Sequence, residues 1–137
     1  MSYEDEYKEW ENSPEEYWGK KASNILWNKK WSSIIKKENE NDWTWFPDGE
    51  LNTCYNCLDF HINNGKGNKI ALIYDSPVTN QKKFYTYNDL LNKTARIAGA
   101  LKEHNVQKGD RVLIYMPMVP EAVTSMLACA RLGAIHV

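Results

Sequence analysis

The last part of the chain shows the clearest pattern of apolar and polar positions. Residues 111–116 (Arg-Val-Leu-Ile-Tyr-Met) form a short apolar run without polar alternation, which is typical of a strand covered on both faces. A helical pattern follows from Pro120 to Arg131 and ends at Gly133. Residues 134–137 begin a second apolar run. This order predicts a strand–helix–strand unit whose strands run parallel and are joined by a right-handed crossover.

The middle of the chain predicts a hairpin followed by an amphipathic helix. Residues 69–75 and 83–87 are rich in β-branched and aromatic side chains, and turn-forming residues separate them. Thr86 and Asp89 have the spacing of a capping box, which marks the start of a helix. Apolar residues recur at helical spacing from there to about His104.

The first part of the chain is more polar and less sharply patterned. Ser13, followed by Pro14 and Glu16, predicts a helix start with a capping box. We expect that helix to continue to about Leu26 and a second helical piece to lie near residues 29–37.

The connecting segments complete the predicted architecture. Residues 38–43 and 46–52 are rich in turn formers, so we expect loops there. Residues 54–63 predict a helix or turn that ends at a Gly- and Asn-rich segment. The fold class is therefore α/β: an N-terminal helical arm, then a hairpin, a helix and a strand–helix–strand unit that begins an incomplete sheet. Because such a sheet exposes a strand edge, we expect the chain to self-associate.

Composition narrows the function classes. The chain has 137 residues, 42% of them apolar and 26% charged, and a formal net charge of −1, which indicates an ordinary globular protein. The first 60 residues carry 13 acidic and seven basic side chains and all six tryptophans, whereas residues 61–137 carry five acidic and ten basic ones. Without a concentrated basic face we expect no nucleic-acid partner. No run of 18 apolar residues occurs, so we expect no membrane span. The acidic start and the three cysteines favour reduced thiols and a cytoplasmic location.

The two cysteines at positions 54 and 57, with a histidine four residues further on, are the most suggestive chemical pattern. A structural zinc site needs four ligands and a catalytic one three plus water, whereas Cys54, Cys57 and His61 supply three at most. A redox pair of this spacing usually begins a helix after a strand, and no strand precedes this one. Packing, metal binding and redox chemistry all remain possible from these residues, with packing favoured.

The other polar residues form no recognisable active site. No glycine-rich phosphate loop is found, and the Gly-Lys-Gly in residues 64–68 precedes a predicted strand rather than a helix. Asp110 and Glu121 flank the predicted strand 111–116 without a partner. His104 ends a predicted helix, where a charged imidazole is favoured. His136 lies in an apolar run, and a histidine in such a run is usually buried in the core. The residues alone therefore assign no catalytic, no cofactor-binding and no metal-binding residue.

Four segments resemble a known family in both order and spacing. They lie at residues 17–31, 45–65, 69–91 and 95–137, and the most specific stretch is Gly-Asp-Arg-Val-Leu-Ile-Tyr-Met-Pro-Met-Val-Pro-Glu-Ala-Val. They resemble the N-terminal part of the short-chain acyl-CoA synthetases, which are AMP-forming acetate– and propionate–CoA ligases of the adenylate-forming superfamily. The segment Ile-Tyr-Asp-Ser-Pro-Val-Thr is closer to the propionyl-type branch.

The resemblance also bears on the two cysteines at positions 54 and 57. The family pattern fits Asn52, Asn56, Cys57 and Asp59, implies no metal there, and leaves Cys54 incidental.

The resemblance implies a two-step reaction. A carboxylate attacks the α-phosphate of ATP to give an acyl-adenylate and pyrophosphate, and the CoA thiol then displaces AMP. In the family, the residues for ATP, Mg²⁺, CoA and the acyl group lie downstream of this segment. We therefore expect ATP, Mg²⁺ and CoA to serve the full-length enzyme and none of them to bind this chain, which alone should be inactive.

The same resemblance implies a division of the chain and its partners. Residues 1–68 would form the acidic, Trp-rich N-terminal arm, and residues 69–137 the truncated beginning of the AMP-binding domain. The expected partners are the remainder of the ligase chain and, in the full enzyme, a short-chain carboxylate such as acetate or propionate. The alternative is a truncated natural product that acts as a protein-binding or regulatory module.

Overall fold

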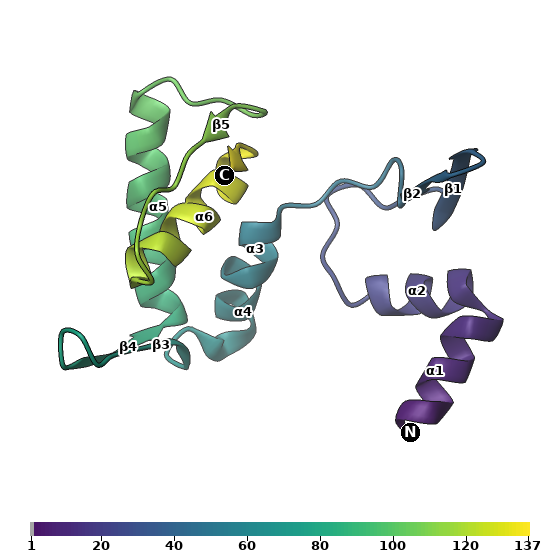
Figure 1. Ribbon diagram of the computed structural model, residues 1–137, viewed down its shortest axis with the longest axis horizontal. Helices are drawn as coiled ribbons and strands as arrows, with labels where there is room; N and C mark the ends of the chain where they lie inside the picture. The colour runs from purple at the N-terminus through teal and green to yellow at the C-terminus, as the bar shows by residue number, and fades with distance from the viewer. Residues whose placement is uncertain (1) are drawn as a thin grey trace. The chain divides into compact units, whose positions relative to one another are not determined.

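The computed structural model describes residues 2–137, which divide into two compact units (Figure 1). The first unit ends at Leu51, and the second spans Asn52–Val137. None of the helices in the described residues is long and apolar enough to cross a membrane.

The first unit pairs two helices with a small antiparallel hairpin. Its elements are α1 (Tyr3–Asn12), α2 (Pro14–Ala22), β1 (Ile35–Asn39) and β2 (Asp42–Trp45). Sequence reasoning did not predict α1. It begins at a capping box in which the Ser2 side chain accepts a hydrogen bond from the Asp5 backbone N–H, and the Asp5 carboxylate accepts one from the Ser2 N–H.

Ser13 is the N-cap residue of α2 and Pro14 begins the helix, as predicted, but the predicted capping box with Glu16 is wrong. The Ser13 side chain makes no capping hydrogen bond, while its backbone N–H donates to Glu9 at the end of α1. Ser13 therefore serves as the C-cap of the preceding helix. The helix also ends earlier than expected, at Ala22, whose carbonyl accepts a hydrogen bond from the Trp27 indole N–H.

The second predicted helical piece, residues 29–37, is also wrong, as is the predicted loop at residues 38–43. Most of this region forms the β1–β2 hairpin, in which Ile35 lies opposite Trp45 and Lys37 opposite Trp43. β-branched and aromatic side chains suit a ladder better than a helix. The Lys37 ammonium also lies over the Trp43 ring, 5.2 Å from its centroid.

Aromatic rings in edge-to-face contact hold the first unit together. The Trp27 and Trp31 ring centroids lie 4.9 Å apart, those of Trp31 and Phe46 5.0 Å, and those of Trp18 and Trp45 6.1 Å. Such pairs add to the energy of apolar burial. Several of these indoles nevertheless stay exposed, so the unit relies on ring pairs more than on a closed core.

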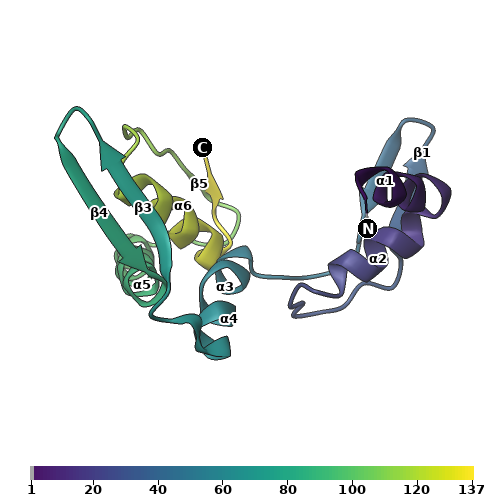
Figure 2. The same cartoon turned by 90° about the horizontal axis from the view of Figure 1, so that it is seen from below.

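The second unit contains the rest of the elements (Figure 2). In chain order they are α3 (Thr53–Cys57), α4 (Asp59–His61), η1 (Ile62–Lys66), β3 (Ile70–Ser76), β4 (Gln81–Thr86), α5 (Tyr87–Glu103), β5 (Arg111–Val112), α6 (Pro120–Leu132) and β6 (Ile135–His136).

Most predictions for this unit are confirmed. β3 and β4 form the predicted antiparallel hairpin. Thr86 and Asp89 form the predicted capping box at the start of α5. α6 ends at Gly133 in the left-handed conformation, where glycine is favoured. β5 precedes α6 in the chain and β6 follows it, and the two strands pair in parallel, as the strand–helix–strand pattern predicted. The predicted α/β class with an incomplete sheet is thus confirmed.

The core of the second unit lies where α3 meets the two long helices. Cys54, Leu58 and Leu90 are buried together. α5 packs against α6 (Figure 1), and the small residues Ala98 and Ala128 are buried. Small side chains let helix backbones approach closely.

One prediction for this unit is wrong in extent. Of the apolar run 111–116, only Arg111 and Val112 pair as a strand. Leu113 is 75% exposed and Tyr115 is 97% exposed. A strand is buried on both faces only when strands and helices surround it, and β5 has β6 as its strand neighbour in the described residues. The expected self-association through the open edge stays a prediction.

Candidate functional site

A single amide side chain joins the start of α3 to the end of α6. Asn52 precedes α3 as its N-cap, and its Oδ1 accepts a hydrogen bond from the Tyr55 backbone N–H at 3.0 Å. Its Nδ2 donates to the backbone carbonyls of Ala130 at 3.3 Å and Arg131 at 3.1 Å. The last carbonyls of a helix have no partner within the helix. Asn52 therefore satisfies a donor of one helix and acceptors of another.

The side chain of Arg131 extends the same junction through a bidentate ion pair. Its Nη1 and Nη2 donate to the two carboxylate oxygens of Asp59, at 2.9 Å and 3.1 Å. The Asp59 side chain is 17% exposed and that of Arg131 32% exposed, so water screens the pair only in part. Hydrogen bonding to Asp59 raises the pKa of Arg131 above its usual value, so the guanidinium stays charged at every accessible pH.

Cys54 lies against this ion pair. Its Sγ is 3.7 Å from Arg131 Nη1, and the side chain is fully buried. Burial raises the pKa of the Cys54 thiol, although the neighbouring Arg131 opposes this shift. A buried, protonated thiol is inert, so Cys54 packs in the core and is not incidental to the fold.

The three cysteines are free thiols in different surroundings. Cys54 and Cys129 are buried, whereas Cys57 is exposed. Burial also raises the pKa of the Cys129 thiol. Within residues 2–137 there is no group of three or more His, Cys, Asp or Glu side chains that could hold a metal ion. The arrangement favours packing over the metal and redox interpretations of Cys54 and Cys57.

The other polar residues that the sequence singled out lie apart from this junction. Asp110 accepts a hydrogen bond from the Gln107 backbone N–H in the turn before β5. Glu121 is in the first turn of α6, and His104 is the exposed C-cap of α5. His136 is exposed in β6 and is not the core histidine that its apolar surroundings predicted.

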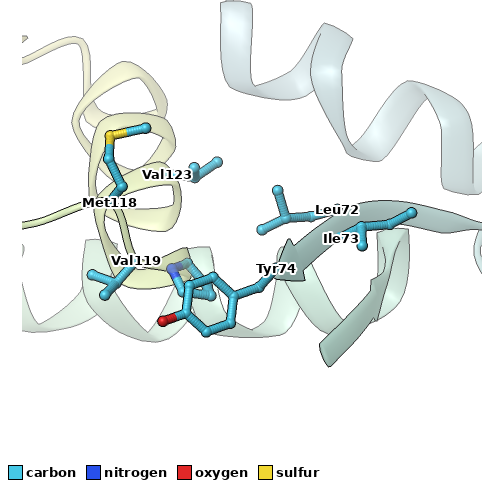
Figure 3. Close-up of a pocket in the computed structure, with 7 residues that line it drawn as sticks. Leu72, Ile73, Tyr74, Met118, Val119 and Val123 are labelled. Atoms are coloured by element: carbon cyan, nitrogen blue, oxygen red, sulfur yellow. The ribbon is translucent and has the colours of Figure 1, made fainter. Parts of the chain in front are cut away.

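An apolar hollow lies between the β3–β4 hairpin and the start of α6. It has a volume of about 140 Å³ and is lined by Leu72, Ile73, Tyr74, Met118, Val119, Pro120 and Val123. Figure 3 shows the side chains of β3 facing those of residues 118–123 across this space. A second hollow of about 490 Å³ shares part of this lining and continues toward the hairpin turn, residues 75–79.

The place of the hollows in the fold points to ligand binding more than the polar groups of their lining do. They lie where the chain passes from β5 to α6, and open α/β sheets bind ligands at the carboxyl ends of their strands. The polar groups of the lining are few. Hydrogen bonding with Ser76 and Thr79 lowers the pKa of Tyr74, and Asp75 pairs with Lys82 at 3.1 Å. This set offers shape and hydroxyl groups but no paired cations for a phosphate.

Comparison with known proteins identifies the family. The family described as AMP-binding enzyme matches residues 60–137, and the one described as Acetyl-coenzyme A synthetase N-terminus matches residues 3–57. The Asn52–Arg131 junction therefore links residues of the two matched regions. Asp59 itself lies between them.

Curated relatives agree with these matches. The human protein named acyl-CoA synthetase short-chain family member 3, mitochondrial, is 53% identical over 123 residues, which are 90% of this chain and 18% of that protein. The acetyl-coenzyme A synthetase of Leptospira biflexa is 42% identical over 135 residues, which are 98% of this chain and 21% of that protein. The chain thus spans about a fifth of the length of these relatives.

A solved structure supports the fold. Acetoacetyl-CoA synthetase from Streptomyces lividans superposes with a TM-score of 0.81 at 23% identity, over 94% of this chain and 20% of that one. The chain therefore belongs to the AMP-binding enzyme family and corresponds to the N-terminal part of its short-chain acyl-CoA synthetases.

Proposed function

We propose that this chain is the N-terminal section of an AMP-forming ligase that joins a short-chain carboxylate, acetate or propionate, to CoA. The supporting observation is the pair of adjacent family matches, residues 3–57 and 60–137, in the order found in acetyl-coenzyme A synthetases. In the proposed reaction the carboxylate displaces pyrophosphate from ATP, and the CoA thiol then displaces AMP from the acyl-adenylate.

Among the described residues there is no group of three or more His, Cys, Asp or Glu side chains that could hold a metal ion. We therefore assign no reaction step to the metal here. ATP, Mg²⁺ and CoA would be used by the whole ligase, and the remainder of the ligase chain would be the partner of this section. We assign no catalytic residue to it.

Within the ligase, residues 1–68 would act as the N-terminal arm and residues 69–137 as the beginning of the AMP-binding domain. The proposed compartment is the cytoplasm, because all three cysteines are free thiols and such thiols persist under reducing conditions. The human relative is named mitochondrial. Fractionation of cells that produce the protein would separate the two compartments.

A segment exchange tests the ligase function. Residues 1–137 would replace the matching first fifth of the Leptospira biflexa acetyl-coenzyme A synthetase, and pyrophosphate release and thioester formation would be measured with acetate and with propionate. We expect the chimera to keep activity within roughly tenfold of the parent. The synthetase without this section and the 137-residue chain alone should both be inactive.

Two results would contradict the proposal. One is a soluble, folded chimera that forms neither the adenylate nor the thioester. The other is acyl-CoA formation by the purified 137-residue chain, which would mean that it holds catalytic groups of its own.

A further inference from the structure

Two side chains from outside α6 bind its last turn. Asn52 binds its terminal carbonyls, and Asp59 binds the guanidinium of Arg131. We propose that Asn52, Asp59 and Arg131, together called the clasp, are positioning residues that set the docking of β6 onto β5. This inference goes beyond the proposed function and does not depend on it.

The path from the clasp to β6 is short. Arg131 is followed by Leu132 and by Gly133, which turns the chain in the left-handed conformation. The Gly133 carbonyl then accepts a hydrogen bond from the Gly109 N–H at 2.9 Å, and the Ile135 N–H donates to Asp110 at 2.7 Å. Because Ile135 lies only four positions after Arg131, any shift of the end of α6 moves the groups that form the first backbone hydrogen bonds between β6 and the segment before β5.

β6 cannot hold this position through its own pairing. It pairs with β5 over two residues, Ile135 opposite Arg111 and His136 opposite Val112. An isolated two-stranded pair is marginal in water even when it is longer. The β6 side chains are exposed and add little burial. The fixed end of α6 therefore adds a restraint on β6 beyond the backbone hydrogen bonds that join residues 133–137 to residues 109–114.

The chemistry of Asn52 explains why an amide is needed at this position. An amide has both a carbonyl acceptor and two N–H donors, whereas a carboxylate only accepts. Asn52→Asp would keep the acceptor that caps α3 but would place an oxygen against the Ala130 and Arg131 carbonyls. This substitution therefore separates the two roles of the side chain while changing its shape very little.

The position of β6 bears on any ligand at this edge of the fold. Ligands of open α/β sheets bind beyond the carboxyl ends of parallel strands. The clasp lies at the opposite, amino-terminal end of β6. It would act as a remote determinant of the geometry at the carboxyl edge without touching a ligand.

Hydrogen exchange of backbone amides in the full 137-residue chain tests the clasp. We expect Asn52→Asp to speed exchange at Ile135 and Val137 at least tenfold, because their amides donate to Asp110 and Val112 across the β5–β6 pair. Amides in the middle of α5 should keep their wild-type rates, as should the Tyr55 amide, whose acceptor remains.

Asn64→Asp is the matched control. The Asn64 Nδ2 also donates to a backbone carbonyl, that of Phe60 at 2.7 Å, but Asn64 is exposed and lies outside the clasp. It should leave the Ile135 and Val137 rates unchanged. Arg131→Lys is the milder second variant, since it keeps the charge and loses the bidentate geometry. It should raise the same two rates, by a smaller factor.

The pattern of exchange decides the matter. Faster exchange confined to β6 in both clasp variants, with the control unchanged, would support the proposal. A uniform rise across α5 and β6 would overturn it, because the three residues would then only stabilise the unit as a whole. Unchanged rates at Ile135 and Val137 in Asn52→Asp, or no protection of these amides in the wild type, would overturn it as well.

Discussion

The core beneath α3 should control the stability of the second unit but not that of the first. Leu58 is 2% exposed and packs with Cys54 and Leu90. Leu58→Ala replaces a buried isobutyl side chain with a methyl group and leaves a cavity, at a cost of about 3 kcal/mol. A unit of this size loses roughly 4–8 °C in Tm per kcal/mol. We therefore expect the Tm of the second unit to fall by about 12–24 °C.

The distribution of tryptophan allows the two units to be measured separately in one sample. All six tryptophans lie at or before Trp45, in the first unit. Tryptophan fluorescence thus reports the first unit, whereas far-ultraviolet circular dichroism is dominated by the long helices α5 and α6 of the second. In Leu58→Ala, the dichroism transition should move and the fluorescence transition should stay.

Leu113→Ala is the control, because the same atoms are removed from a side chain that is 75% exposed. It should change the free energy of unfolding of neither unit by more than about 0.5 kcal/mol. A Leu58→Ala shift as small as that of the control would refute the assigned core. Equal movement of both transitions would refute the independence of the two units.

Three further predictions rest on single groups. Thr86→Ala should destabilise the second unit by about 1 kcal/mol in urea unfolding, because it removes the cap of α5, and Thr86→Ser should restore most of the loss. Cys54→Ser should cost about 1–3 kcal/mol by burying a hydroxyl group, whereas Cys57→Ser should be neutral in the same assay. Hydrogen bonding to Thr86 lowers the pKa of Asp89, and the Lys21 hydrogen bond lowers that of Glu6. The stabilisation that the two ionised carboxylates provide is complete above the ordinary carboxyl pKa, and it is lost as the pH falls through their lower folded-state pKa values. The Tm measured at a series of pH values should therefore fall below about pH 4.

The elements that sequence predicted correctly have local signals. Thr86 and Asp89 are three residues apart, and the hydrogen bonds that they exchange lie within that span. α6 begins at Pro120 and ends before Gly133 because of the backbone preferences of these two residues themselves. The parallel pairing of β5 and β6 followed from the intervening helix, which returns the chain to the end of the sheet where the first strand began.

The predictions that failed depended on contacts made elsewhere. Residues 29–37 have acceptable helix propensity, yet the bridge of Lys29 to Glu50 and the pairing of Ile35 with Trp45 hold both ends of this range in extended structure. Ser13 has the sequence of an N-cap, but the end of α1 takes its backbone N–H first. In each case a neighbouring element that the local pattern does not encode competes for the same group.

The clasp was beyond sequence reasoning for the same reason. Asp59 and Arg131 are 72 residues apart, and Asn52 and Arg131 are 79 apart. Two signals were available: asparagine three residues before Tyr55 is a favoured N-cap, and the family pattern includes both Asn52 and Asp59. Nothing in a single sequence says that the other half of that amide binds a second helix.

The residues that line the hollows explain why we assign this chain a supporting role in the proposed ligase. Transfer to and from an α-phosphate needs charged groups aimed at the phosphate oxygens. Neither hollow beside α6 has a lysine or arginine in its lining, and Arg131 is paired with Asp59. The hollow beside α6 is lined mainly by apolar side chains. Because the Arg131 guanidinium holds a helix end, we propose that this section would serve the reaction through the position of its strands. The exchange rates at Ile135 and Val137 report how stably those strands are paired.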